Sequence, residues 1–234
     1  MSTQTYPQGK PKQLLFLTAT RVQQSFAAAA EKRTLAWLAE RTPRRINSDH
    51  LTLLGFVAQC LAGVCYALAR WNRYTLLLSI VFLALNWLGD SLDGTLARVR
   101  NCQRPRYGFY VDHITDTIAA FFLMAGLALS GYIRPAIAFA MLIAFLMLSI
   151  EAYLATYTLG QFRLSYWKFG PTEIRLLLAA GNLALLRWPA AKLPGTQLLL
   201  FDVGGVIGIV GMALMLIVSA IHHSARLYRE EKLS

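Results

Sequence analysis

Six long apolar stretches, separated by short polar segments, dominate the chain. They cover residues 51–68, 74–96, 109–131, 135–159, 172–188 and 198–222. Each is long enough to cross a hydrocarbon core of about 30 Å as a helix. Helices are expected because lipid offers the backbone amides no other hydrogen-bond partners. The pattern therefore predicts an all-α membrane protein with six transmembrane helices.

A further helical pattern precedes the first apolar stretch, at residues 15–41. Alanine-rich and charged faces alternate there with the helical period, which is typical of an amphipathic helix at a membrane interface. The loops between spans are short, so no second folded domain is expected. We divide the chain into an N-terminal segment (1–48) with the amphipathic helix, a six-helix transmembrane domain (49–228) and a short tail (229–234).

The composition and charge agree with a membrane location. Hydrophobic residues make up 56% of the chain and charged residues 15%, which is too apolar for an ordinary soluble domain. The formal charge of +11 could indicate a nucleic acid, but the basic residues lie between apolar blocks and at the ends, without interleaved aromatic residues. We expect no nucleic acid partner; an anionic membrane surface or a phosphate-bearing substrate fits better.

The distribution of lysine and arginine predicts the orientation in the membrane, because cytoplasmic flanks retain positive charge. With the N-terminus inside, most basic residues fall on the cytoplasmic side. The outer side then holds a small group: Arg70, Arg73, Arg134, Arg187 and Lys192. Both termini are therefore predicted to be cytoplasmic, in the inner membrane if the protein is bacterial.

Four aspartates interrupt the apolar pattern where the second span ends and the third begins. Asp90 and Asp93 lie within one helical turn, and Asp112 and Asp116 lie one turn apart on the next helix. Each pair has a glycine beside it, which lets a ligand approach the backbone closely. A short loop joins the two helices. We expect them to pack antiparallel and to bring the four carboxylates together on the cytoplasmic side.

Clustered carboxylates in a membrane repel one another unless they are compensated. One or two divalent cations would provide that compensation, and ligation by oxygen alone favours Mg²⁺ or Mn²⁺ over zinc. Such ions suit substrates that carry phosphate. A structural alternative is that each aspartate pairs with a nearby arginine and fixes helix packing. The spacing of the four carboxylates favours the metal interpretation.

This stretch resembles the signature of the CDP-alcohol phosphatidyltransferase family, DxxDGxxAR followed by eight or nine residues and GxxxDxxxD. Here Asp90-Ser-Leu-Asp93-Gly94-Thr-Leu-Ala97-Arg98 is followed by nine residues and by Gly108-Phe-Tyr-Val-Asp112-His-Ile-Thr-Asp116. Every fixed position of the signature is filled. The six spans and the preceding amphipathic helix are also similar to that family.

The resemblance implies a membrane enzyme that moves a phosphatidyl group from a CDP-linked lipid, such as CDP-diacylglycerol, to the hydroxyl of a small polar alcohol and releases CMP. It assigns metal binding to Asp90, Asp93 and Asp112, with Asp116 contributing to a second metal site and acting as general base. It assigns the nucleotide site to Gly94, Ala97, Arg98 and Gly108. Family members are often homodimers, so a second copy and membrane lipid are the expected partners.

The signature leaves the acceptor alcohol open. Candidates for binding a phosphorylated acceptor are Arg106, Arg163, Lys168 and Arg175, although each could instead contact lipid headgroups. The segment Gly170-Pro-Thr-Glu173 resembles one in the aminoalcohol phosphotransferase branch, where Glu173 would accept a cationic headgroup. The same glutamate would also suit a helix N-terminus. Both acceptor classes stay open, and Glu151 is expected to pair with Arg175.

Two neighbouring positions, 49 and 113, carry less information about the site. Asp49 stands where many members of the family carry an asparagine, three residues before Thr52, which leaves a nucleotide contact there in doubt. His113 points about 100 degrees away from Asp112 on an ideal helix and is expected to pack.

Two other activities also use membrane carboxylates. An intramembrane prenyltransferase binds a diphosphate through Mg²⁺, but it has more spans and a different aspartate spacing. A divalent-cation transporter would place carboxylates along a path through the bilayer, whereas these cluster near one face.

Overall fold

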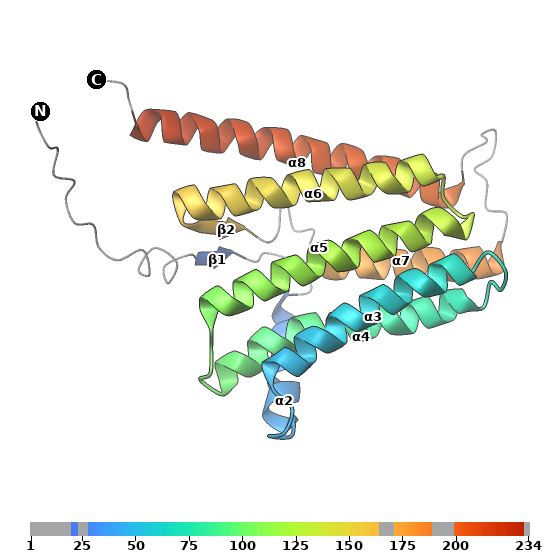
Figure 1. The fold of residues 1–234 in the computed structure, drawn as a ribbon, viewed down its shortest axis with the longest axis horizontal. Coiled ribbons are helices and arrows are strands. Elements are labelled where there is room, and N and C mark those ends of the chain that lie inside the picture. Colours follow the sequence, from blue (N-terminus) through green and yellow to red (C-terminus); the bar gives the residue numbers. More distant parts are fainter. Residues whose placement is uncertain (1–19, 23–27, 164–170, 189–198, 232–234) are drawn as a thin grey trace, which may run out of the picture.

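The computed structural model describes residues 20–22, 28–163, 171–188 and 199–231, and these residues are almost entirely helical. Figure 1 shows the long helices running side by side along the long axis of the molecule. The elements in chain order are β1 (Thr20–Val22), α2 (Ala28–Arg41), α3 (Ser48–Leu68), α4 (Thr75–Val99), α5 (Pro105–Ser130), α6 (Pro135–Leu159), β2 (Gln161–Arg163), α7 (Pro171–Arg187) and α8 (Leu200–Glu230).

Five of the described helices are long and apolar enough to cross a membrane: α3, α4, α5, α6 and α8. This confirms an all-α membrane protein. The stretch predicted at 172–188 forms α7, which has 17 residues and is not among the five. A sixth span therefore stays a prediction. Many leucine, valine, isoleucine and phenylalanine side chains are exposed on the five helices, as a lipid-facing surface requires.

Local sequence signals set the helix ends. Pro105 and Pro135 stand at the first positions of α5 and α6, where a missing backbone N–H leaves no hydrogen bond unmade. Gly131 and Gly160 follow the last residues of these helices with φ of 78° and 65°, a conformation that glycine adopts without strain. The Asn47 side chain accepts from the backbone N of His50 at 3.0 Å and caps α3. The predicted bounds of 135–159 are those of α6.

Helix α3 packs extensively against both α4 and α5. The contact with α4 is close at Gly55 and Gly89, where a Cβ on Gly89 would lie 2.6 Å from the Gly55 backbone nitrogen. Small residues allow this approach. Within the described residues, α4 and α5 have few direct contacts with each other. The expectation that these two helices pack on one another is thus corrected: α3 holds both.

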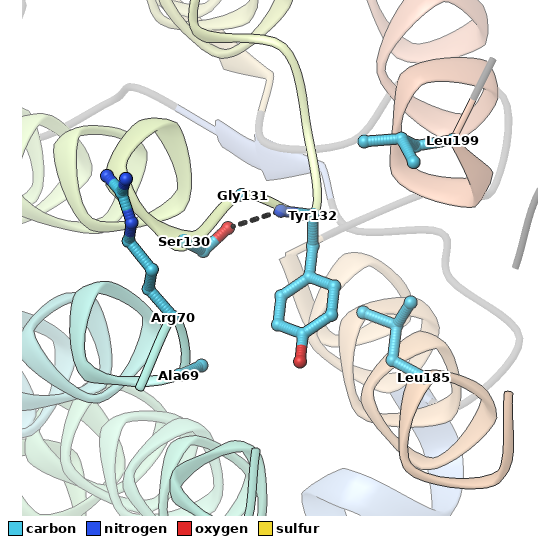
Figure 2. A pocket seen from close by; sticks show the side chains of 7 residues that line it. All are labelled: Ala69, Arg70, Ser130, Gly131, Tyr132, Leu185 and Leu199. Carbon is cyan, nitrogen blue, oxygen red and sulfur yellow. Dashed lines mark hydrogen bonds between the residues drawn. The ribbon is translucent and has the colours of Figure 1, made fainter. Parts of the chain in front are cut away.

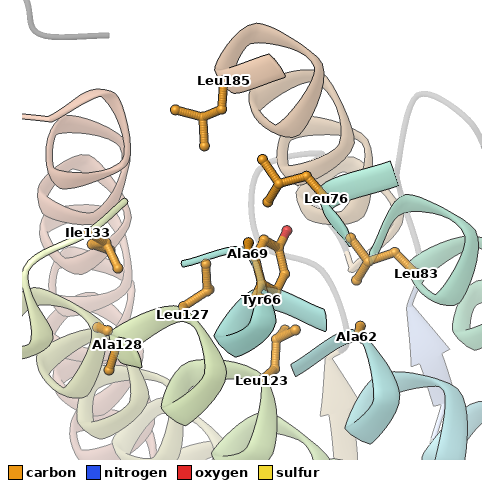
Figure 3. Packing of buried hydrophobic residues seen from close by; sticks show 11 residues of the cluster. Ala62, Tyr66, Ala69, Leu76, Leu83, Leu123, Leu127, Ala128, Ile133 and Leu185 are labelled. Carbon is orange, nitrogen blue, oxygen red and sulfur yellow. The ribbon is translucent and has the colours of Figure 1, made fainter. Parts of the chain in front are cut away.

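The hydrophobic core lies between α3, α4, α5 and α7 (Figure 3). Its centre is Tyr66 on α3, which is fully buried. Around it pack leucines of the three other helices: Leu76, Leu83, Leu123, Leu127 and Leu185. Leu185 is the member of this cluster that comes from α7, so the core also includes α7 in the bundle.

The predicted helix at 15–41 is wrong in its first part. Thr20–Val22 forms the strand β1, which pairs in parallel with Gln161–Arg163 of β2, and α2 begins at Ala28. Two of the three β1 residues are β-branched and favour a strand. The rest of the predicted range, 15–19 and 23–27, lies outside the described residues. Leu35 and Ala39 of α2 pack against leucines of α3 and α4, so α2 is docked on the bundle.

Candidate active site

Three of the four aspartates form a compact cluster. Asp90 on α4 and Asp112 and Asp116 on α5 each place a carboxylate oxygen within 4.8 Å of the other two. Asp112 and Asp116 share a face because they are one helical turn apart. Like charges this close raise the free energy of the ionised site unless a cation lies between them. The donor set, carboxylate oxygens alone, fits Mg²⁺ or Mn²⁺.

A cavity of about 10 Å³ lies against this cluster and has Asp90, Asp93, Asp112 and Asp116 in its wall. That volume corresponds to about one water-sized sphere. The space beside the carboxylates therefore suits a single ion or water molecule, which supports the metal interpretation from the shape of the site as well as from its charge.

Asp93 has a different environment from the other three aspartates. The hydroxyl of Thr52 donates to Asp93 Oδ2 at 2.6 Å, and the hydroxyl of Ser48 donates to the Asp93 carbonyl at 3.0 Å. Both hydroxyls come from the first turns of α3, an element that sequence reasoning did not include in the site. The spacing of four residues between Ser48 and Thr52, ahead of an apolar run, is the signal that could have indicated them.

Arg175 reaches the cluster from α7. Its Nη2 donates to Asp90 Oδ2 at 2.7 Å and its Nε donates to Asn86 Oδ1 at 2.7 Å. Asn86 is buried, and its amide nitrogen donates to the Gly55 carbonyl at 3.0 Å. The structural alternative, pairing of aspartate with arginine, thus applies to Asp90. Asn86, which sequence reasoning missed, orients the guanidinium.

The expected pairing of Glu151 with Arg175 is wrong. Glu151 Oε1 lies 2.6 Å from Nδ1 of His223, which joins α6 to α8. The helices explain the difference: α6 packs along α8, whereas α7 packs along α4. Arg175 is therefore directed to the aspartates of α4.

A larger cavity of about 360 Å³ opens beside the cluster. Asp90, Asp93 and Asp112 form one part of its wall, and the four predicted nucleotide-binding residues form another: Gly94, Ala97, Arg98 and Gly108. A Cβ on Gly108 would meet no atom within 4 Å, and one on Gly94 would meet only the Arg98 side chain, at 3.5 Å. Packing of the protein does not require these glycines, so the space beside them is available to a ligand.

The rim of this cavity carries an ion pair between Arg104, in the loop before α5, and Asp49, in the first turn of α3. The hydrogen bond to Asp49 raises the pKa of Arg104, so the guanidinium stays charged. The same guanidinium lies 4.2 Å from the ring centroid of Tyr107. The His113 ring is stacked on that of Phe109 at 4.0 Å between centroids, but its Nδ1 also lies 3.4 Å from Oδ2 of Asp112. The expectation that His113 points away from Asp112 is therefore wrong.

The structure brings one of the acceptor candidates, Arg175, into contact with the carboxylates. Glu173 lies two residues earlier in α7, with its Oε1 buried. Arg106 is exposed in the first turn of α5 and is not part of the cavity wall. Arg163 belongs to β2. Lys168 lies outside the described residues.

A separate pocket of about 260 Å³ lies at the other end of the bundle. Figure 2 shows its wall, which is formed by the turn after α3, the turn after α5 and residues of α7 and the start of α8: Ala69, Arg70, Ser130, Gly131, Tyr132, Leu185 and Leu199. Among the described residues, none in its wall carries a carboxylate. The chemistry of the signature is confined to the opposite end, where α4 ends and α5 begins.

The fold and the aspartate cluster define an integral membrane enzyme whose site suits a divalent cation and a phosphate-bearing substrate. The family model for CDP-alcohol phosphatidyltransferase matches residues 46–220, most of the chain, and the chain belongs to this family of transferases of phospholipid biosynthesis. The family uses CDP-linked lipid donors and alcohol acceptors in a membrane and generally depends on divalent metal ions.

Among curated proteins, the archaetidylinositol phosphate synthase of Pyrococcus horikoshii is 31% identical over 104 residues, which is 44% of this chain and 52% of the relative. The chain thus spans about half the length of that relative. The similarity agrees with the family and with transfer to an alcohol from a CDP-linked lipid.

Proposed function

We propose that this protein transfers the phosphatidyl group of CDP-diacylglycerol to the hydroxyl of a small polar alcohol and releases CMP. The observation that carries the proposal is the cluster of Asp90, Asp112 and Asp116, of which Asp90 and Asp112 line a cavity of about 360 Å³. The cavity wall contains the residues that the family signature assigns to the nucleotide: Gly94, Ala97, Arg98 and Gly108.

Asp90, Asp112 and Asp116 are the residues that would hold a Mg²⁺ or Mn²⁺ ion, and Asp93 would complete a site for a second ion. When bound, such an ion neutralises the negative charge that develops on the pyrophosphate as the phosphoryl bond breaks. Thr52 holds the Asp93 carboxylate in place through its hydroxyl. Gly94 and Gly108 leave room for the nucleotide to approach the two helices.

Asp116 is proposed as the general base. Its carboxylate accepts the proton of the acceptor hydroxyl, whose oxygen then attacks the lipid-linked phosphorus. The bond between that phosphorus and the bridging oxygen breaks, and CMP leaves with the electron pair. Asp116 lies in the wall of the small inner cavity, together with Asp90 and Asp93, so the proton is removed close to the cluster.

We further propose that the acceptor carries a phosphate, as inositol phosphate does. The support is the guanidinium of Arg175, which is held beside the cluster by Asp90 and Asn86, and the name of the curated relative. The second candidate is transfer in the opposite sense, in which phosphocholine or phosphoethanolamine moves from CDP-choline or CDP-ethanolamine to the hydroxyl of a lipid alcohol and CMP leaves. Its support is Glu173, whose Oε1 is buried in the first turn of α7, two residues before Arg175.

We also propose that both termini and the active site lie on the cytoplasmic side of the membrane. Residues 49–228 form the catalytic domain, between the segments 1–48 and 229–234. Two copies of the chain form a homodimer. The distribution of basic residues supports the orientation, and the family resemblance supports the dimer. Labelling of the exposed Cys102 beside the site, from one side of sealed vesicles, tests the orientation. Cross-linking in detergent tests the dimer.

The activity is tested by CMP release from the purified protein. Each reaction contains CDP-diacylglycerol as donor, Mn²⁺ and one acceptor: inositol phosphate, glycerol phosphate, inositol, serine or ethanolamine. A further reaction with CDP-choline as donor and diacylglycerol as acceptor tests the second candidate. Asp116→Asn is expected to reduce turnover by at least about 100-fold. The matched control is Glu40→Gln, an exposed position on α2. Normal turnover of the Asp116 variant would exclude its role as base.

A further inference from the structure

Glu31 lies where α2, α4 and α7 meet. Its Oε1 accepts three hydrogen bonds: from the indole nitrogen of Trp87 at 2.9 Å, from the hydroxyl of Ser91 at 3.2 Å and from the hydroxyl of Thr172 at 3.3 Å. Its second oxygen is buried. Two of the donors belong to α4 and one to α7. A single carboxylate oxygen on the helix before the spans thus joins two helices that carry site residues.

The donors of Glu31 are close neighbours of the active site along their helices. Ser91 directly follows Asp90, and Thr172 precedes Arg175 by three residues, which places both α7 side chains on one face of the helix. Arg175 and Asp90 form their own ion pair at 2.7 Å. Helices α4 and α7 are therefore joined at two successive levels, through Glu31 at the first turn of α7 and through Asp90 one turn later.

Of these two contacts between α4 and α7, only the one through Glu31 uses no group that takes part in the proposed reaction. The link through Asp90 involves a carboxylate that the proposed ion also needs, and a guanidinium that the proposed acceptor also needs. The link through Glu31 involves none of these groups. Hydrogen bonds to a charged carboxylate are stronger than those between neutral groups. The Glu31 link can therefore hold the start of α7 in place while the partners of Arg175 change.

We propose that Glu31 is a positioning residue for Arg175: it fixes the first turn of α7 against α4 and thereby keeps the Arg175 guanidinium at the aspartate cluster. The proposal rests on the proposed function for the role of Arg175. It assigns to α2 a part in the geometry of the site, although α2 contributes no group to the cavities beside the aspartates.

A distance measurement between two spin labels tests the positioning directly. In a background without cysteine, one label is attached at position 78 of α4 and one at position 176 of α7, where Leu78 and Leu176 are exposed. The wild-type contacts predict one narrow distance distribution. Glu31→Ala is expected to broaden or shift it. Glu31→Gln is expected to restore it, because the amide oxygen still accepts from the three donors.

Two further variants separate positioning of α7 from general stability. Thr172→Val removes the only described α7 donor to Glu31 and keeps the hydrogen bonds from Trp87 and Ser91. It is therefore expected to broaden the spin-label distance distribution as Glu31→Ala does. The change in melting temperature is expected to be smaller than for Glu31→Ala. Glu40→Ala, at an exposed position on α2, is the matched control and is expected to have no effect. An unchanged distribution in Thr172→Val and Glu31→Ala would overturn the proposal.

Binding of Mn²⁺, followed by electron paramagnetic resonance, provides a second readout. A guanidinium beside a carboxylate opposes binding of a cation there, so Arg175→Met is expected to tighten Mn²⁺ binding about threefold, the size of a partly exposed ion pair. Glu31→Ala is expected to tighten it in the same direction. The double variant is expected to equal Arg175→Met alone, because both changes act through one group.

The outcomes distinguish this inference from the proposed function. Additive effects of Glu31→Ala and Arg175→Met would mean that Glu31 acts independently of Arg175 and would overturn the positioning role. If the wild-type protein bound no Mn²⁺, the metal site of the proposed function would fail, and the spin-label distances would still decide the role of Glu31.

Discussion

Arg175 and Asp90 form an ion pair across two helices, with 2.7 Å between Nη2 and Oδ2. The side chains are 15% and 26% exposed, so the pair is shielded from solvent without being closed off. The remaining N–H groups of the guanidinium can donate to a further anion, in the forked geometry that matches a phosphate. The first turns of α7 thereby supply positive charge directly beside the cluster of Asp90, Asp112 and Asp116.

Arg175→Lys should discriminate between the acceptor classes. Lysine keeps the charge but not the forked donors, and the loss of one charge-assisted hydrogen bond should raise KM for a phosphorylated acceptor about tenfold, with KM for CDP-diacylglycerol unchanged. Steady-state CMP release measures both constants. Arg187→Lys, exposed in the last turn of the same helix, is the control. Unchanged constants for Arg175→Lys would favour an acceptor without phosphate.

Two glycine-to-alanine variants should have opposite effects. At Gly108 an added methyl group meets no protein atom within 4 Å. We therefore expect unchanged or slightly higher stability, by up to about 1 kcal/mol, but a higher KM for the CDP-linked lipid because the methyl group enters the ligand cavity. At Gly89 the methyl group would lie 2.6 Å from the Gly55 nitrogen, and we expect destabilisation of about 1–3 kcal/mol. Thermal unfolding in detergent and lipid-dependent kinetics measure the two effects. A lower melting temperature for the Gly108 variant would contradict the assignment of an open cavity.

Thr52→Val should weaken the site through Asp93. Valine has nearly the same shape as threonine, but it removes the hydroxyl that donates to Asp93 Oδ2 at 2.6 Å. A hydrogen bond to a charged group contributes about 1.5–3 kcal/mol, so we expect turnover to fall about tenfold or more. Thr158→Val is a suitable control, since the exposed Thr158 hydroxyl donates to the Leu154 carbonyl within its own helix, away from the site. Equal effects of the two variants would mean that the loss reflects helix stability alone.

Removal of divalent ions should abolish CMP release reversibly. Carboxylate oxygens alone form the cluster of Asp90, Asp112 and Asp116, so activity should return with Mg²⁺ or Mn²⁺ after treatment with EDTA, and Zn²⁺ should substitute poorly. Asp112→Asn should raise the Mn²⁺ concentration needed for half-maximal activity about tenfold or more. Full activity in EDTA would exclude a metal-dependent mechanism.

The sequence alone was sufficient to predict the class of fold and to locate the aspartates that we propose as metal ligands and general base. Long apolar stretches determine membrane-spanning helices because a backbone in lipid must satisfy its own hydrogen bonds, and the bounds of α6 follow from Pro135 and Gly160. Spacings of three and four residues place Asp90 near Asp93 and Asp112 near Asp116 whatever the helices pack against. These are local properties, and a local pattern is enough to specify them.

Tertiary structure decided which distant side chains complete the site. Helix α3 rather than a direct contact joins α4 to α5, because glycines on α3 and α4 let their backbones approach closely. That packing brings Thr52 to Asp93, Arg175 to Asp90 and Glu31 to α7. Each of these contacts joins residues more than 40 positions apart, and such pairings depend on how whole helices pack. No local pattern in the chain encodes this packing. The proposed reacting groups could therefore be predicted from the sequence, whereas the groups that contact them could not.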